Sequence, residues 1–238
     1  MVNKLGIIVQ AHMGSTRLKN KMMLDLCGES VISRVISRIK KADHADLLII
    51  ATSNLTADDC IVEECKLHNV NYFRGDDQNV LKRFYDTAKK FNLSDVARVC
   101  ADNTLVDWEI INSEIDVYRS SDYDIVTTGK TVPLGLGCEI FSFELLQNAY
   151  EHASKDYHFE HVTPYLYEQD YKIFEYNIAK DFGKYRFTLD AVEDFTLIKN
   201  IYNELRTKED FVLRDVIKTM EANRDWIKIN ENVKQITF

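Results

Sequence analysis

The sequence contains no long apolar run, and this absence excludes a membrane-spanning helix. Such a helix needs about 20 predominantly apolar residues, and the 238-residue chain has no comparable stretch. The N-terminal segment MVNKLGIIVQAHMGS holds an apolar run shorter than the hydrophobic region of a signal peptide, and a polar loop without an export cleavage pattern follows it. We therefore expect no membrane insertion and a cytoplasmic location.

Paired cysteines are also missing. The five cysteines are an odd number at irregular spacing, and no two of them form a C-x-x-C pair. They are Cys27, Cys60, Cys65, Cys100 and Cys138. This distribution predicts reduced thiols and excludes a disulfide framework or a cysteine-rich zinc site.

The chain lacks the basic excess that nucleic-acid binding requires, and it has little proline or glycine. Its 30 basic and 38 acidic residues give a net charge of −8, so we expect no nucleic-acid partner. Because there are two prolines and eight glycines, each one is informative. Gly129, Gly135 and Gly137 lie close together, which predicts a break in the regular architecture.

What the chain does have is alternating strand and helix patterns. Continuous apolar runs predict buried parallel strands at 5–11, 47–52, 70–73 and 96–100. Apolar residues at helical spacing predict helices at 30–41, 56–68, 78–91 and 107–120. Ser30 is the expected N-cap of the first helix, and Thr56 with Asp59 the expected capping box of the second. The series predicts one α/β domain over 1–238, with a doubly wound, mostly parallel sheet in the strand order 3-2-1-4.

The pattern loosens after Tyr123. We expect a strand at 124–128, a glycine-rich hairpin or crossover at 131–141, helices at 142–153 and 158–168, a strand at 185–190, and helices at 192–204 and 211–223. Seven of the twelve tyrosines lie between Tyr150 and Tyr185, and they either pack within one chain or form a dimer surface. We interpret 131–185 as a hairpin-and-helix embellishment for acceptor binding and dimerisation, which the sheet does not need for its completion.

The loop after the first strand is basic. Ligands of a doubly wound sheet bind where the strand order reverses, which directs attention to the loops at 12–21 and 101–106. Four basic residues precede Asp25, the first acidic residue of the chain. They are Lys4, Arg17, Lys19 and Lys21. Gly14 and Ser15 would let backbone N–H groups approach phosphate oxygens, although neither the GxxxxGK[ST] spacing nor a dinucleotide fingerprint is present. The loop is therefore either an anion site or a solvated basic loop.

Two carboxylates are candidates for a metal site. Asp102 directly follows the fourth strand, where it would face nucleotide phosphates only with a metal between them, and Mg²⁺ is held in this way by one or two carboxylates plus phosphates. The alternative is a turn residue bonded to its own backbone. Asp190 ends the predicted strand YRFTLD, where it either caps the next helix together with Glu193 or joins the metal site. These two roles do not exclude each other.

Taken together, the segment IIVQAHMGSTRLKNKMMLDLCG resembles the opening of the cytidylyltransferases of the spore-coat polysaccharide F type, relatives of the CMP-sialic acid and CMP-ketodeoxyoctonate synthetases. The resemblance continues in order through ATS (51–53), FRGDDQNVLKRFYDTA (73–88), RVCADNTLVDWEII (98–111), GLGCEIFSFELL (135–146), EHVTPYL (160–166) and RFTLDAVEDFTLI (186–198). Its most specific motifs are GSTRL and FRG-x₄-VL-x-R. It implies a Rossmann-like, GT-A-like nucleotidyltransferase that uses CTP and Mg²⁺ and forms a homodimer.

The resemblance also implies roles for individual residues, carried over by position. The nucleotide-binding residues are expected to be Ala11, His12, Gly14, Ser15, Thr16, Arg17, Lys21, Thr52, Arg74 and Ala101. Arg17 and Lys21 are the expected catalytic residues, which contact the triphosphate. Asp102 and Asp190 are expected to hold Mg²⁺. The acceptor site is expected to include Asp77, Gly135, Glu139, His161 and Thr163.

Several positions depart from the family pattern. His12 stands where the family usually has arginine, so that a permanent phosphate-binding charge is removed. Ala101 replaces a usual glycine, and Thr104 a usual proline. Leu134 and Gly137 replace acidic residues of the common DGLDVE pattern. The loss of two carboxylates there suggests a more anionic acceptor.

The implied reaction transfers CMP from CTP to a small acceptor and releases pyrophosphate, for cell-surface polysaccharide or glycoconjugate synthesis. A sugar hydroxyl would need a general base, and no convincing one is evident, which favours an acceptor that is already ionised: a sugar acid, a phosphate or a phosphonate. Two alternatives stay open. One is a nucleotide-sugar-dependent glycosyltransferase, which would typically show a D-x-D pair. The only such pair here, Asp122-Tyr123-Asp124, comes before a predicted strand and not after one, which disfavours this alternative. The other is a catalytically silent nucleotide-binding protein.

Overall fold

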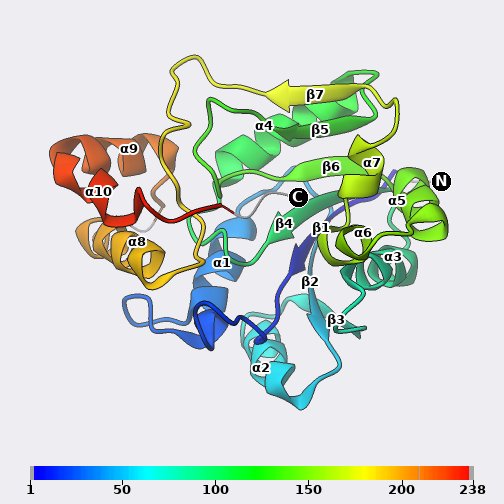
Figure 1. The fold of residues 1–238 in the computed structure, drawn as a ribbon, viewed down its shortest axis with the longest axis horizontal. Helices are drawn as coiled ribbons and strands as arrows, with labels where there is room; N and C mark the ends of the chain where they lie inside the picture. The colour runs from blue at the N-terminus through cyan, green and yellow to red at the C-terminus, as the bar shows by residue number, and fades with distance from the viewer. Residues whose placement is uncertain (1–2, 209, 236–238) are drawn as a thin grey trace.

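A single sheet of seven strands lies at the centre of the computed structural model, which describes residues 3–208 and 210–235 (Figure 1). Its strands are β1 (Leu5–Gln10), β2 (Leu47–Ser53), β3 (Asn71–Gly75), β4 (Asp95–Cys100), β5 (Ile125–Thr128), β6 (Glu139–Ser142) and β7 (Ile173–Tyr176). Their order is β3-β2-β1-β4-β6-β5-β7. The strands β1 to β4 are parallel, and only β6 runs antiparallel to its neighbours. The predicted α/β fold and the 3-2-1-4 order are confirmed.

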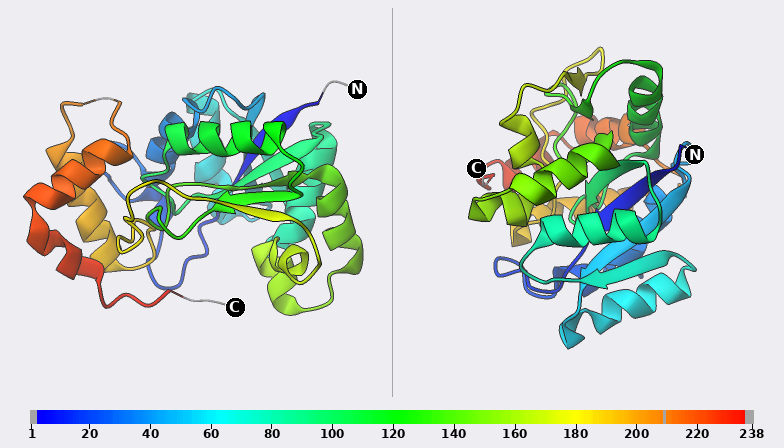
Figure 2. Two further views of the ribbon diagram at one scale, coloured as in Figure 1. Left: turned by 90° about the horizontal axis from the view of Figure 1, so that it is seen from above. Right: turned by 90° about the vertical axis from the view of Figure 1, so that its right-hand side faces the viewer.

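Helices cover both faces of this sheet (Figure 2). The helices are α1 (Val31–Ile39), α2 (Asp59–Leu67), α3 (Val80–Lys90), α4 (Trp108–Ser120), α5 (Phe143–His152), α6 (Asp156–His161), α7 (Pro164–Tyr167), α8 (Val192–Glu204), α9 (Leu213–Ala222) and α10 (Ile227–Asn230). Short 3-10 turns are η1 (Lys21–Met23), η2 (Thr56–Asp58) and η3 (Arg224–Trp226). In the part of the chain that the structure describes, no helix combines the length and apolarity needed to cross a bilayer.

The alternation of side chains along β1 explains the two helical layers. Leu5, Ile7 and Val9 belong to a core cluster with α1, α2, α4, α8 and α9. Ile8 points to the other face and belongs to a cluster with α3, α5 and α7. A strand that is buried on both faces reads as a continuous apolar run, which is why the first strands could be predicted.

The two predicted helix starts have different outcomes. Ser30 caps α1 as expected, because its hydroxyl oxygen accepts from the backbone N–H of Ser33 at 3.1 Å. The capping box of Thr56 and Asp59 is wrong, since Thr56 begins the turn η2 and α2 follows it. The carboxylate of the intervening Asp58 instead contacts the loop after β1 and the end of β2.

The predicted strand at 185–190 is wrong. Its only β-type contact in the described residues is an isolated bridge between Arg186 and Leu134. Phe187 and Leu189 are still fully buried, so the alternating pattern reports an extended segment packed into the core. Its backbone hydrogen bonds go to two different loops, and no neighbouring strand continues the ladder.

The segment 131–185 is part of the sheet, contrary to expectation. It supplies β6, which lies between β4 and β5, and β7, an edge strand that the sequence did not predict. The side chains of β7 alternate only between exposed and half-buried, so the strand leaves no buried pattern in the sequence. The predicted helix at 158–168 is two short helices, α6 and α7, separated where Val162 has a φ of 69°. Pro164 at the start of α7 disfavours one continuous helix.

Candidate active site

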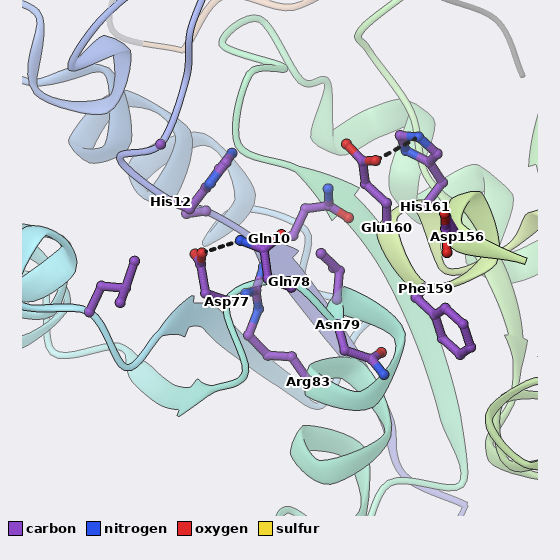
Figure 3. Close-up of a pocket in the computed structure, with 14 residues that line it drawn as sticks. Gln10, His12, Asp77, Gln78, Asn79, Arg83, Asp156, Phe159, Glu160 and His161 are labelled. Carbon is purple, nitrogen blue, oxygen red and sulfur yellow. Dashed lines mark hydrogen bonds and ion pairs between the residues drawn. The ribbon is translucent and has the colours of Figure 1, made fainter.

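Two cavities open at the carboxyl ends of β1 and β4, where the strand order reverses. The first has a volume of about 730 Å³ and lies between the end of β1, the start of α3 and α6 (Figure 3). The second has a volume of about 550 Å³ and lies between the ends of β4 and β5 and the glycine-rich segment before β6. The two share a wall, because Arg98 in the second cavity donates through Nε to Oε1 of Gln10 in the first, at 3.2 Å.

The basic loop after β1 forms one side of the first cavity. Of the predicted nucleotide-binding residues, Ala11, His12 and Gly14 line it. A Cβ atom on Gly14 would lie 3.0 Å from Nδ1 of His12, so the glycine leaves room for the imidazole ring. Desolvation and then the positive charge of Arg83 lower the pKa of His12 below its ordinary value. The ring is therefore neutral at pH 7 and can act there as a hydrogen-bonding group without a fixed charge.

Asp58 holds this loop in place, and sequence reasoning missed it. Its Oδ1 accepts from the backbone N–H of Met13 at 2.7 Å, and its Oδ2 accepts from the Thr52 hydroxyl at 2.9 Å and the Ser53 N–H at 3.0 Å. Burial alone would raise the pKa of Asp58, but the hydrogen bonds from Ser53, Met13 and Thr52 bring it below its ordinary value. Thr52, expected at the nucleotide, is fully buried beneath the loop and acts on the cavity through Asp58.

Arg83 is a second residue that sequence reasoning missed. It extends from α3 into the lining of the first cavity and is buried. Nη1 donates to the carbonyl oxygen of Asp76 at 2.7 Å, whereas Nε has no hydrogen-bond partner among residues 3–208 and 210–235. Burial lowers the pKa of this guanidinium, and nearby carboxylates led by Asp58 oppose the shift. Arg83 therefore adds a largely buried positive charge to the wall of this cavity, which suits an anionic ligand. The available signal was the last arginine of FRG-x₄-VL-x-R.

The predicted metal and catalytic residues form one charged cluster. Nζ of Lys21 lies 3.2 Å from Oδ2 of Asp102 and 3.5 Å from Oδ1 of Asp190, and donates to the Leu189 carbonyl oxygen at 3.0 Å. Arg17 also contacts Oδ1 of Asp190, at 3.0 Å. No group of three or more His, Cys, Asp or Glu side chains in the described ranges could hold a metal ion, so the site offers these two carboxylates.

Asp190 is supported by residues that the sequence did not single out. Arg186 contacts Oδ2 of Asp190 at 2.7 Å and Oδ1 of Asp194 at 3.0 Å. The predicted cap by Glu193 is wrong: Asp194, fully buried, accepts from the backbone N–H groups of Asp190 and Ala191, both at 3.0 Å. A carboxylate therefore does cap the start of α8, but it belongs to Asp194, one position after the predicted Glu193.

The predicted acceptor residues divide between the two cavities. Gly135 and Glu139 line the second cavity, whereas Asp77 and His161 line the first. Thr163 is placed next to Glu139, to which its hydroxyl donates at 3.1 Å. The same carboxylate accepts from the Tyr167 hydroxyl at 2.6 Å and pairs with the guanidinium of Arg98. This network makes the carboxylate part of the cavity wall.

Apart from Ala11, His12 and Gly14, the predicted nucleotide-binding residues lie outside the two cavity linings, as do the predicted metal ligands Asp102 and Asp190. Arg74 donates to the carbonyl oxygens of Ser53 and Leu55 and pairs with Asp59 at 2.5 Å, so it braces the end of β2. Ala101 is buried directly after β4. Ser15 and Thr16 belong to the same loop as His12, and Oγ of Ser15 accepts from the N–H of Leu18 at 3.4 Å.

Known proteins are similar to this chain over nearly its whole length. A family model described as cytidylyltransferase matches residues 6–229. An uncharacterized protein of Methanocaldococcus jannaschii, MJ1063, is 36% identical over 239 residues, which cover 97% of this chain and 96% of that protein. The spore coat polysaccharide biosynthesis protein SpsF of Bacillus subtilis is 29% identical, over 94% of this chain and 97% of its own.

A solved structure agrees with these sequence relatives. A cytidylyltransferase from Leptospira borgpetersenii serovar Hardjo-bovis superposes with a TM-score of 0.90 and 29% identity, over 99% of both chains. The resemblance to cytidylyltransferases that the motifs indicated is therefore confirmed over nearly the whole chain.

Proposed function

The chain belongs to the cytidylyltransferase family, and from that premise we propose that it transfers CMP from CTP to a small anionic acceptor, with release of pyrophosphate. Sugar acids, phosphates and phosphonates fit this description. The relationship to a spore coat polysaccharide biosynthesis protein supports a role in cell-surface polysaccharide or glycoconjugate synthesis.

The observation that carries the proposal is the pair of adjoining cavities at the strand-order reversal. The first is lined by Arg83 and by His12 and Gly14 of the loop after β1, and it has the volume of a nucleotide site, which suits CTP. The second adjoins it through the contact between Arg98 and Gln10, so an acceptor there would lie next to the nucleotide. Transfer between two bound substrates requires such neighbouring sites, because catalysis depends on holding the reacting atoms in line.

The residues present fit Mg²⁺. Asp102 and Asp190 both have an oxygen within 3.5 Å of one cationic atom, Nζ of Lys21, so the two carboxylates already face a point where positive charge is held. Two carboxylates together with substrate phosphates are the ligands that Mg²⁺ commonly takes in proteins. When bound, Mg²⁺ would neutralise phosphate charge and polarise the α-phosphate of CTP.

The protein's own cations complete the proposed mechanism. An oxygen of the acceptor attacks the α-phosphorus of CTP, the bond to the bridging oxygen breaks, and pyrophosphate leaves with the negative charge. Lys21 and Arg17 supply positive charge to the oxygens on which this charge grows. Arg186 and Asp194 hold Asp190 in position from behind. An ionised acceptor oxygen needs no general base.

The position of the D-x-D pair disfavours a glycosyltransferase. Asp122 and Asp124 immediately precede β5, and β5 runs in the same direction as β4, because both pair antiparallel with β6. The two aspartates therefore lie at the amino-terminal edge of the sheet, opposite the cavities. Asp124 accepts from the backbone N–H of Lys172 at 2.8 Å, which is a structural contact.

The homodimer also remains part of the proposal. The segment 131–185 contains the edge strand β7 and three exposed large apolar side chains, Leu134, Tyr167 and Ile173. An uncovered edge strand with apolar neighbours favours association. Some tyrosines of the segment pack within the chain instead: Tyr150 stacks on Tyr85 at 4.4 Å between ring centroids, and Tyr185 is buried.

Pyrophosphate release tests the proposal. The protein is mixed with Mg²⁺, each of CTP, UTP, ATP and GTP, and a panel of sugar acids, phosphates and phosphonates. We expect release with CTP and at least one acceptor. Thermal-shift titration with the four nucleotides should show CTP stabilising the fold most, since a ligand that binds only the native state raises its stability. Binding of CTP without release from any acceptor would favour the silent binding protein.

A further inference from the structure

A buried carboxylate lies directly behind the second cavity, and the proposed mechanism does not use it. Glu114, in α4, has no exposed surface. Its Oε1 accepts from the Thr128 hydroxyl at 2.6 Å, and its Oε2 accepts from the backbone N–H and the thiol of Cys138 at 2.9 and 3.1 Å. A carboxylate in the interior is costly, and an apolar side chain often replaces such a group without loss of stability. Packing alone therefore does not account for it.

The absence of a side chain at Gly137 leaves room for the Glu114 carboxylate. A Cβ atom at position 137 would collide with Oγ1 of Thr128 and lie 2.6 Å from Oε1 of Glu114. Thr128, Gly137 and Cys138 all line the second cavity, so the hydrogen bond between Glu114 and Thr128 forms the layer immediately beneath its surface.

The hydrogen-bonding capacity of Thr128 depends on Glu114. A threonine hydroxyl has one hydrogen, and ionised Glu114 takes it at Oε1, so that Oγ1 offers only lone pairs to the cavity. The backbone N–H of Cys138 can only donate and keeps Oε2 an acceptor. A proton on Oε1 of Glu114, or the amide N–H group of a glutamine at this position, would therefore point at Thr128. The hydroxyl hydrogen of Thr128 would then turn toward the cavity or toward the Cys138 carbonyl oxygen, 3.3 Å away.

We propose that Glu114 is a positioning residue that sets acceptor specificity by holding Thr128 as a hydrogen-bond acceptor for a hydroxyl group of the substrate. This inference rests on the proposed function and narrows it. The acceptor then carries a hydroxyl group that donates to Thr128, in addition to its anionic group. A simple phosphate ester without a hydroxyl donor fits the same cavity less well.

The charge state of Glu114 supports a specificity that varies with pH. Burial raises the pKa of Glu114 to about 7, with its hydrogen bonds opposing and Glu139 adding to the shift. The titratable groups facing it are the Cys138 thiol and the Glu139 carboxylate, while β5 contributes the non-titrating Thr128 hydroxyl. The pKa of the thiol is raised well above its ordinary value, so it stays protonated while Glu114 titrates. Thr128 therefore accepts above neutral pH and gains a donor form below it.

The test compares two probes and four variants. The probes are 3-deoxy-manno-octulosonate, a hydroxylated acid, and methyl phosphate, an anion without a hydroxyl donor. The variants are Thr128→Val, Thr128→Ser, Glu114→Gln and, as a control on the same helix, Glu109→Gln, which changes an exposed carboxylate paired with Arg214. The KM values for acceptor and CTP are measured from pyrophosphate release at pH 6 and pH 8.

The expected result is a change in acceptor KM alone. Thr128→Val should raise the KM for 3-deoxy-manno-octulosonate about tenfold or more, because a cavity built to bond a hydroxyl loses its partner, while Thr128→Ser should restore it. In Glu114→Gln the amide N–H group faces Thr128, so the preference should shift toward methyl phosphate and no longer depend on pH. Glu109→Gln should match wild type, and the KM for CTP should change less than about twofold in all four.

Three outcomes would overturn the inference. One is a Glu114→Gln protein with a lower melting temperature but an unchanged ratio of the two acceptor KM values, which shows a purely structural role. Another is wild-type enzyme that uses methyl phosphate as well as the hydroxylated acid, in which case the proposed function stands without the inference. If no acceptor supports release, the proposed function fails, and calorimetric Kd values of the two probes on CTP-bound protein take the place of KM. The third outcome that would overturn the inference is that 3-deoxy-manno-octulosonate does not bind to the CTP-bound protein in this calorimetric measurement.

Discussion

The ammonium group of Lys21 lies 3.2 Å from a carboxylate oxygen of Asp102, although the two residues are 81 positions apart in the chain. The contact follows from the sheet: β1 and β4 are adjacent parallel strands, with Gln10 opposite Cys100 at their carboxyl ends. The basic loop after β1 and the acidic loop after β4 therefore meet at one edge. The basic and acidic side chains that the proposed mechanism uses come together there because of this pairing.

The two carboxylates of the cluster should differ in their effect on stability. Asp102→Asn and Asp190→Asn are each expected to lower kcat at least about 100-fold, by removing charge that acts on the phosphates. Asp102 is half-exposed, so its variant should keep the wild-type melting temperature. Asp190 is buried against Arg17, Lys21 and Arg186, and its variant should also lose about 1–3 kcal/mol of stability.

Steady-state kinetics and thermal melts measure both effects, with the exposed Asp170→Asn as the matched control. If Asp190→Asn retains near wild-type activity while its melting temperature falls, the residue has a structural role and the metal assignment is wrong.

Arg83 should govern nucleotide affinity. Arg83 lines the first cavity, and its Nε is buried without a hydrogen-bond partner in the described chain. Lysine has no donor at that position and no planar group. Arg83→Lys is therefore expected to raise the KM for CTP about tenfold, the loss of one charge-assisted hydrogen bond. Arg119→Lys, at an exposed ion pair with Asp46, serves as the control. An unchanged KM for CTP would place the nucleotide elsewhere.

His12 should make CTP binding depend on pH. The pKa of His12 is lowered, so the ring takes up a proton only below its ordinary titration range, near pH 6.5. A triphosphate favours the protonated ring, and the KM for CTP should fall as the pH drops below about 6.5. His12→Arg, with a permanent charge, should bind CTP more tightly at pH 8 and remove this dependence. If the KM for CTP of wild type and of His12→Arg varied with pH in the same way, His12 would not contact the phosphates.

Glu114 should make the stability of the fold decrease toward alkaline pH. Its pKa is raised from 4.5 to about 7, so the folded state binds the proton more tightly than the unfolded state. The stabilisation is complete below pH 4.5 and is lost as the pH rises through 7. Relative to Glu114→Gln, wild type should lose about 3 kcal/mol between pH 4.5 and pH 8.5. Urea unfolding across this range measures the difference, and equal slopes for both proteins would contradict a buried, titrating carboxylate.

The edge strand β7 should mediate dimerisation. Light scattering at micromolar concentration should give about twice the chain mass of 27.7 kDa. Ile173→Lys, on the outer strand, should give monomers, because a charge on an edge strand opposes pairing. Leu67→Lys, at an exposed apolar side chain of α2 outside the segment, should leave the dimer intact. A wild-type mass near 27.7 kDa would end the hypothesis.

The positions of several candidate residues could be predicted because they belong to a loop that follows a buried strand. His12 and Gly14 line the first cavity and Asp102 lies at the end of β4, as the strand pattern indicated. Two buried charged residues on helices were missed. Arg83 and Glu114 occur within amphipathic helices, where a charged side chain usually faces solvent, and only the packing of α3 and α4 turns them inward.

The sequence by itself determined the order of strands and helices from β1 to β5, since burial on one or both faces leaves a local periodicity of side chains. It also showed which charged residues belong to the loops after β1 and β4. Only the tertiary structure decided that β6 enters the sheet between β4 and β5, that 185–190 finds no strand partner, and that Arg186 and Asp194 support Asp190. These outcomes depend on which distant segments share backbone hydrogen bonds and ion pairs, and a periodicity of a few residues carries no information about such partners.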